Sequence, residues 1–169
     1  PLSVDDDFLA QFVAELAQIS HLKRLRIHTR LPVVIPGRIT SGLIDVLMRS
    51  RLKPVVVVHI NHPAEIDTGL SDALQRFVCA GIPLLNQCVL LRGVNDNVDT
   101  LAELSEKLFD SGVIPYYINL LDKVRGAAHF EIPDRAALEI YDMLRRKLPG
   151  YLVPRLVRDG SDSPYKRWL

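Results

Sequence analysis

The chain of 169 residues is long enough for one domain or a large part of one. Hydrophobic residues make up 48% of it and charged residues 24%, as in an ordinary globular protein. The formal net charge of +1 gives no electrostatic argument for nucleic acid or an acidic membrane as a partner. No apolar run approaches the roughly 20 residues that span a bilayer, and no signal peptide is visible at the N-terminus.

Two cysteines, Cys79 and Cys88, are too few for a disulfide scaffold or a four-thiolate metal site. Each lies in an apolar stretch, which predicts buried thiols rather than ligands. A reducing, cytoplasmic setting is the simplest interpretation. The chain opens Pro1-Leu2-Ser3 without a methionine, so we expect it to begin inside a longer protein.

Hydrophobic periodicity in the first half predicts alternating helices and strands. The predicted elements, in chain order, are a helix capped by Ser3, a strand over 25–28, a helix capped by Thr40, a strand over 53–60 and a helix over 70–80 that ends at Gly81. Four consecutive valines in the second strand indicate burial on both faces, as in a parallel sheet. The third helix is expected to point Ala73, Leu74, Phe77 and Val78 inward.

The second half continues the alternation. Its predicted elements are a strand over 83–91, a helix over 98–111, a strand over 114–121, a helix from Pro133 to about Leu148, and a last strand over 151–157. Phe109 is expected on the apolar side of the fourth helix. Continuously apolar strands with amphipathic helices between them predict the α/β class, with parallel strands and outer helices. An open doubly wound sheet or part of a barrel would both satisfy this order.

Ligands of parallel β/α proteins meet the carboxyl ends of the strands. Polar residues gather at those ends in this sequence, namely Arg26, His28, Arg30, His59, Asn61, His62, Asn86, Gln87, Asn95, Asp96, Tyr116, Tyr117, Asn119, Asp122, Arg158 and Asp159. Most have structural alternatives. His59 and His62 could be satisfied loop histidines, because two histidines without a third ligand make a poor metal site. Residues 95–97 could cap the next helix. Lys166, near the C-terminus, could be a surface lysine.

Several long motifs occur in a fixed order along the chain: Arg26-Ile-His-Thr-Arg-Leu-Pro-Val-Val-Ile-Pro, His59-Ile-Asn-His-Pro-Ala-Glu-Ile, Leu84-Leu-Asn-Gln-Cys-Val-Leu-Leu-Arg-Gly-Val-Asn-Asp, Pro115-Tyr-Tyr, Leu121-Asp-Lys-Val-Arg-Gly-Ala-Ala-His-Phe and Gly150-Tyr-Leu-Val-Pro. Together they resemble the lysine 2,3-aminomutase family of radical S-adenosylmethionine (SAM) enzymes, over essentially the whole chain. The Leu121 motif and the brief tail are most similar to the branch that acts on a lysine of elongation factor P.

The resemblance implies part of a radical SAM-type (β/α) partial barrel and three cofactors. In the family, a [4Fe–4S] cluster on a CxxxCxxC loop cleaves SAM to a 5′-deoxyadenosyl radical. That radical takes a hydrogen from a lysine bound as an imine to pyridoxal phosphate (PLP), and the amino group then migrates to give (R)-β-lysine. The substrate would be lysine, free or on elongation factor P, and the enzyme a possible homo-oligomer.

By the same resemblance, Lys166 matches the lysine that binds PLP and is the expected catalytic residue. Asp122 and Asp159 match the acids that receive the ε-ammonium of the substrate. Two carboxylates at neighbouring strand ends can pair with one ammonium in a low-dielectric site. Gln87 and His59 match positions beside the adenosyl group of SAM. The family's free-lysine branch binds a structural zinc through cysteines. This chain has no cysteines at the matching positions, so no metal ligand is expected in it.

Two departures from the family pattern matter. Lys166 is followed by Arg167-Trp168-Leu169, whereas the family usually has Thr and often Pro there. No CxxxCxxC motif occurs in the chain. We therefore expect residues 1–157 to be the C-terminal portion of the barrel and residues 158–169 to be a tail with the PLP lysine, inactive without the cluster segment. The alternative is a truncated, non-catalytic barrel fragment or interaction module.

Overall fold

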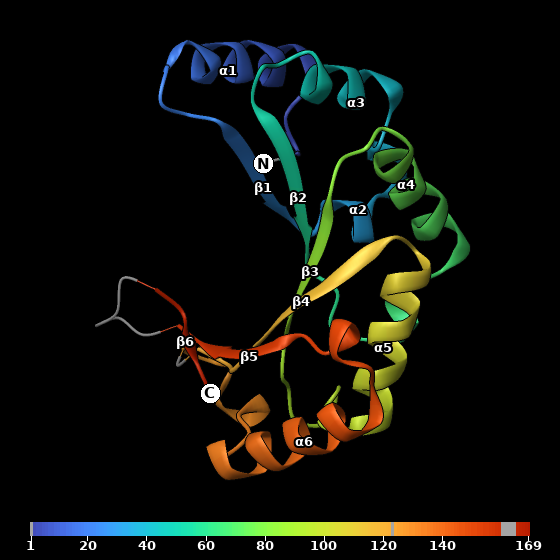
Figure 1. Ribbon diagram of the computed structural model, residues 1–169, viewed down its shortest axis with the longest axis vertical. Helices are drawn as coiled ribbons and strands as arrows, with labels where there is room; N and C mark the ends of the chain where they lie inside the picture. The colour runs from blue at the N-terminus through green and yellow to red at the C-terminus, as the bar shows by residue number, and fades with distance from the viewer. Residues whose placement is uncertain (1, 123, 160–164) are drawn as a thin grey trace. The chain divides into compact units, whose positions relative to one another are not determined.

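The structure is a computed structural model that describes residues 2–122, 124–159 and 165–169 (Figure 1). Its strands are β1 (Arg24–Thr29), β2 (Lys53–Val58), β3 (Leu84–Val89), β4 (Val113–Asn119), β5 (Arg155–Arg158) and β6 (Arg167–Trp168). Its α-helices are α1 (Asp6–Gln18), α2 (Leu31–Val34), α3 (Ser41–Met48), α4 (Thr68–Cys79), α5 (Val98–Asp110) and α6 (Asp134–Lys147). None of the described helices combines the length and apolarity needed to cross a membrane.

The strands form one sheet in chain order, from β1 to β6. Strands β1 and β2 pair in parallel, with Arg24 opposite Lys53, and β4 and β5 pair in parallel, with Tyr117 opposite Arg155. The predicted α/β class with parallel strands is thereby confirmed. Strand β6 pairs antiparallel with β5 and was not predicted, because the sequence gives only a short polar tail there.

Two compact units make up the chain, and each has its own core. The first contains residues up to His59, together with Asp67–Leu85 and Ser111–Val113. In it α1 and α3 pack on each other, and α3 packs on β2. Its fully buried side chains include Leu43, Leu47, Val56, Leu74 and Phe77. Their removal from water is the main stabilising contribution to this unit.

The second unit contains Ile60–Ile66, Asn86–Asp110 and the chain from Ile114 onward. Helices α5 and α6 pack on each other within it. Its buried side chains include Leu101, Leu104, Leu108, Ile118, Leu144, Leu156 and Val157. Strand β4 from Ile114 onward and strands β5 and β6 also belong to it, so the C-terminal site residues are carried by one unit. The predicted division at residue 157 stays a prediction.

Helix starts follow the sequence with one correction. Thr40 caps α3 as predicted, because its Oγ1 accepts a hydrogen bond from the Leu43 N–H at 3.1 Å. The prediction of Ser3 as the cap of α1 was wrong: Asp5 accepts from the Phe8 N–H at 2.7 Å instead. A carboxylate serves this position as well as a hydroxyl and also interacts favourably with the helix dipole.

Burial differs from the prediction at the edges of two helices. Cys79 is exposed rather than buried, whereas Cys88 is buried as predicted. Val78 is 37% exposed and Phe109 49% exposed, although both were assigned to inward faces. Ala73, Leu74 and Phe77 are buried as predicted. Periodicity locates the centre of an apolar stripe, but neighbouring elements decide how far its edges are covered.

Candidate functional site

Lys166 lies at the centre of a polar cluster in the second unit. Its Nζ atom is 2.5 Å from Oδ2 of Asp159 and 2.8 Å from Oδ1 of Asn119. The Nζ atom also lies 5.7 Å from the centroid of the Tyr117 ring, within the range of a cation–π interaction. The Lys166 side chain is only 27% exposed. The alternative prediction, that Lys166 is a solvated surface lysine, is therefore wrong.

The register of three strands brings this cluster together. Asn119 is opposite Val157 in the parallel β4–β5 pair, and Val157 is opposite Trp168 in the antiparallel β5–β6 pair. Residues opposite each other in a sheet point to the same face, and every second residue returns to that face. Lys166, two residues before Trp168, is thus on the face of Asn119. Figure 1 shows the short β6 arrow beside β5.

Asn119 is a site residue to which no role was assigned from the sequence. It ends β4 and is 9% exposed. Its Nδ2 donates to the Cys88 carbonyl at 3.1 Å, and its Oδ1 accepts from Lys166. The sequence signal was only its place among the polar residues at a strand end. Its partner lies 47 residues later in the chain, so spacing could not connect the two.

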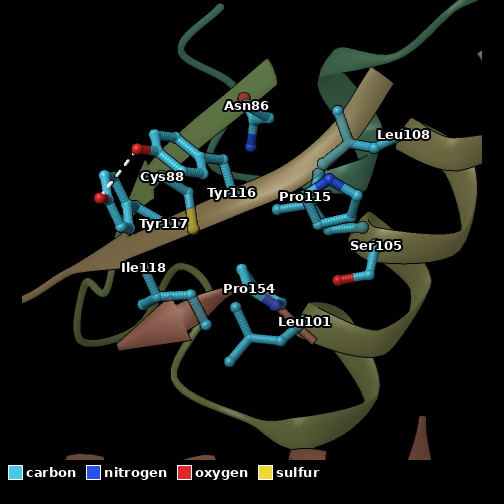
Figure 2. A pocket seen from close by; sticks show the side chains of 11 residues that line it. Asn86, Cys88, Leu101, Ser105, Leu108, Pro115, Tyr116, Tyr117, Ile118 and Pro154 are labelled. Atoms are coloured by element: carbon cyan, nitrogen blue, oxygen red, sulfur yellow. Dashed lines mark hydrogen bonds between the residues drawn. The ribbon is translucent and has the colours of Figure 1, made fainter. Parts of the chain in front are cut away.

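Tyr116 and Tyr117 form a stacked pair beside the cluster. Their ring centroids are 3.7 Å apart, and the Tyr116 hydroxyl donates to the Tyr117 hydroxyl at 2.8 Å. Figure 2 shows this pair at one end of a small cavity whose other lining residues include Cys88, Ser105 and Pro154. The volume of this cavity is about 10 Å³, which holds at most about one water molecule. The cavity is a packing void behind the site rather than a ligand pocket.

Asp122 lies beyond the end of β4 and is exposed. It lines a pocket of about 340 Å³ with Leu121, Val124, Arg125, Ala128 and Glu131. Among the described residues, Lys166 forms an ion pair with Asp159, and no hydrogen bond or ion pair joins it to Asp122. An exposed carboxylate binds an ammonium weakly, and the predicted pairing would need water to be excluded from this pocket.

His59 follows β2 in the first unit and is partly buried. Its ring lies edge-on to that of His28, with centroids 6.0 Å apart and an interplanar angle of 82°. Burial, followed by the nearby positive charge of Arg30, lowers the pKa of His59 below its ordinary value. A neutral imidazole can donate one hydrogen bond and accept another, as contact with a ribose would require.

Gln87 lies in the middle of β3, in the second unit. The strand alternates between buried and partly buried positions, and Gln87 is on the partly buried side while Asn86 and Cys88 are buried. An amide at such a position can both donate to and accept from a ligand. The predicted role of Gln87 and His59 beside SAM stays a prediction.

The structural interpretations of two other motifs are confirmed. His62 Nδ1 accepts from the Ala64 N–H at 3.1 Å, while Glu65 Oε1 accepts from the backbone N–H of His62 at 3.0 Å. Asn97 Oδ1 accepts from the Thr100 N–H at 2.8 Å and caps α5. Within the described ranges, no group of three His, Cys, Asp or Glu side chains is arranged to hold a metal ion.

The sequence comparisons agree with the resemblance read from the motifs. The chain is 51% identical to the L-lysine 2,3-aminomutase of Haemophilus influenzae over 166 residues, which cover 98% of the chain and 49% of that protein. It is 49% identical to the Escherichia coli protein of the same name, with coverages of 98% and 48%. Identity to the Clostridium subterminale L-lysine 2,3-aminomutase is 43%, covering 94% of the chain and 38% of that protein. No protein-family model matches the chain.

Solved structures with a similar fold include a domain of pyruvate-formate lyase-activating enzyme from Bacteroides vulgatus. The TM-score is 0.61 at 15% identity, covering 92% of this chain and 91% of that domain. A radical SAM methyltransferase from Sphaerobacter thermophilus gives a TM-score of 0.54 at 19% identity, covering 79% of this chain and 40% of that one. These likenesses show a fold shared with radical SAM proteins. The chain is therefore related, along nearly its whole length, to the L-lysine 2,3-aminomutases, and it spans about half the length of those relatives.

Proposed function

We propose that the chain is the part of a radical SAM lysine 2,3-aminomutase that holds PLP through Lys166 and the substrate ammonium through Asp159 and Asp122. The observation that carries the proposal is the cluster of Lys166, Asp159 and Asn119. It lies in a chain whose sequence is 49–51% identical to proteins named L-lysine 2,3-aminomutase. The proposed reaction is the conversion of L-lysine to (R)-β-lysine.

The residues around Lys166 fit a covalently held PLP. A partly buried primary amine can be reached by an aldehyde, and the Nζ atom is held in one place by two acceptors. The Tyr117 ring offers a flat aromatic surface close to it. When bound, PLP supplies an electron-accepting ring next to the migrating nitrogen. Lys166 would hold the group covalently, and Tyr117 would lie beside it.

Asp159 has two uses in this proposal. In the structure, it pairs with the Lys166 ammonium at 2.5 Å. When the Lys166 nitrogen is engaged by PLP, the carboxylate becomes available to a second ammonium. A lysine substrate carries such a group on a flexible stem, so the pairing of Asp159 with Lys166 resembles the pairing it would make with substrate. Asp122 would complete the ammonium site once water is excluded.

Radical formation is proposed to use SAM and a [4Fe–4S] cluster. The shared radical SAM fold supports SAM use, and Gln87 and His59 are the proposed contacts to its adenosyl group. The CxxxCxxC ligands of the cluster are not in this sequence, so we expect the 169-residue chain to be inactive alone. Elongation factor P is the proposed destination of the β-lysine, and the cytoplasm is the proposed location.

Borohydride trapping tests the cofactor assignment directly. The chain is incubated with PLP, reduced, digested and mapped by mass spectrometry, with Lys166 expected to be the main labelled residue. Lys147 is the matched control, because its Nζ also lies 2.5 Å from one carboxylate, that of Asp99, but on an exposed helix. Equal labelling of the two lysines would contradict the assignment. The Lys166→Arg variant should lose the label and remain folded.

The reaction is tested in a protein that joins this chain to a segment with CxxxCxxC. With SAM, PLP and a reductant, L-lysine should yield (R)-β-lysine, measured by chiral chromatography. Replacing both Asp122 and Asp159 with Asn should raise the KM for lysine far more than it changes PLP labelling. Assembly of the iron–sulfur cluster without any lysine isomerisation would favour the non-catalytic alternative.

A further inference from the structure

Asn119 has both ends of its amide engaged at the strand end next to Lys166. The Nδ2 atom donates to the Cys88 carbonyl at 3.1 Å, and the Oδ1 atom accepts from Lys166 Nζ at 2.8 Å. The residue is 9% exposed, and Cys88 is buried on β3. Bulk water therefore competes little for the bond to Cys88, while the bond to Lys166 is partly buried.

Only one orientation of this amide satisfies both neighbours. The Cys88 carbonyl can only accept, so it needs the NH₂ group, while an ammonium can only donate, so it needs the oxygen. A flipped amide would place oxygen against oxygen and NH₂ against ammonium. Strand β3 thus fixes which atom of Asn119 faces Lys166, and the atom it presents is an acceptor that cannot donate.

Asp159 differs from Asn119 in the kind of contact it makes. Its side chain is 53% exposed, and its carboxylate has to be free for a substrate ammonium under the proposed function. Asn119 is neutral, mostly buried and held by the backbone of a neighbouring strand. Asn119 is thus the acceptor that stays in place when Asp159 changes partner.

We propose that Asn119 is a positioning residue for Lys166: it fixes the direction of the Nζ atom and binds a positively charged nitrogen more strongly than a neutral one, because a charged donor makes the stronger hydrogen bond. The inference rests on the proposed PLP role of Lys166, but the hydrogen bond to Asn119 also acts on the Lys166 side chain without PLP. In a covalent link to the aldehyde carbon of PLP, which would form with loss of water, the nitrogen would carry an N–H only when it is protonated. Asn119 accepts from that N–H and opposes its loss.

The first test needs no cofactor. The full chain is acetylated with limiting reagent at fixed pH, and the rate at Lys166 is read by mass spectrometry against the other lysines. Asn119→Leu has a similar volume and removes the acceptor, so Lys166 should react about tenfold faster, the size expected when one hydrogen bond to a charged group is lost. Asn119→Asp keeps an acceptor, and its rate should not exceed that of the natural chain.

Asn86 provides the matched control. It is also a buried asparagine, and its amide bonds both the N–H and the carbonyl of Ile60, at 2.9 and 3.0 Å. Within the described part of the chain, no hydrogen bond joins it to a lysine. Asn86→Leu should destabilise the fold but leave the Lys166 rate unchanged relative to the other lysines. An equal change in the Asn86 and Asn119 variants would show a structural role only and would overturn the proposal. If Asn119→Leu does not fold, Asn119→Ala replaces it.

The second test uses the chain loaded with PLP. The visible absorption of the C=N link is titrated with pH, and its midpoint should fall by about one pH unit in Asn119→Leu and not in Asn119→Asp or Asn86→Leu. An unchanged midpoint together with an unchanged acetylation rate refutes the role of Asn119. Absence of any C=N absorption, even after the chain is joined to the segment with CxxxCxxC, refutes the proposed function instead, while the acetylation test still decides the role of Asn119.

Discussion

The guanidinium carbon of Arg155 lies 4.2 Å from the centroid of the Trp168 ring. Arg155 begins β5 and Trp168 ends β6, so this contact joins the two strands outside their backbone hydrogen bonds. Strand β6 consists of Arg167 and Trp168 only, and a one-residue slip would turn Lys166 to the opposite face. The contact therefore helps to keep Lys166 in register.

Trp168→Ala should accordingly weaken the presentation of Lys166. An exposed cation–π contact contributes about 0.5–1 kcal/mol, so the chain should stay folded while labelling of Lys166 by PLP falls several-fold. Trp168→Phe should retain most of the labelling. A matched control is Arg145→Gln, which removes a similar contact to Tyr141 at 5.9 Å on α6. Unchanged labelling in Trp168→Ala would show that backbone pairing alone sets the register.

The contact with Arg155 gives Trp168, two residues after Lys166, a structural role. A two-residue strand carries no periodicity, so β6 could not be predicted, although β1 to β5 could. Asn119 was visible at a strand end, but its role depends on a lysine 47 residues away. Local patterns define elements and strand ends, whereas pairings between distant segments depend on tertiary packing. The same limit explains why Cys79, at the edge of the apolar stripe of α4, was predicted to be buried but is exposed.

Cys79 and Cys88 should differ strongly in reactivity. Burial, with a smaller effect of the nearby Glu65 charge, raises the pKa of Cys88 from an ordinary value of 9.0 to about 12, while Cys79 is exposed. The thiolate is the reacting form, so at neutral pH Cys88 should be alkylated roughly a thousandfold more slowly than Cys79. Timed iodoacetamide labelling with mass mapping measures this. Both thiols should react at similar rates in denaturant, and fast native labelling of Cys88 would contradict its burial.

His59 should make stability depend on pH. Because its pKa is lowered in the folded chain, first by burial and then by Arg30, the unfolded chain binds a proton more readily. Stability is therefore complete above the ordinary histidine pKa of 6.5 and falls as pH drops below it, levelling off below the folded pKa. Urea unfolding between about pH 7.5 and 5 should show a flatter pH dependence in His59→Gln. His21→Gln, at an exposed position, is the control that should keep the natural slope.

Gly81 and Gly112 offer a matched pair for separating backbone strain from steric overlap. Both follow a helix with positive φ, +73° and +76°, so alanine should cost about 1 kcal/mol at either position. A Cβ at Gly81 would meet nothing within 4 Å, but at Gly112 it would lie 2.6 Å from a Val78 methyl carbon. Both substitutions should lower the free energy of unfolding. The loss for Gly112→Ala should exceed the loss for Gly81→Ala by at least ~1 kcal/mol. Adding Val78→Ala should abolish that excess in a double-mutant cycle, because the overlap is with this side chain. Equal losses at the two glycines would mean that Val78 moves aside without cost. Val78 is 37% exposed, so this is the main alternative outcome.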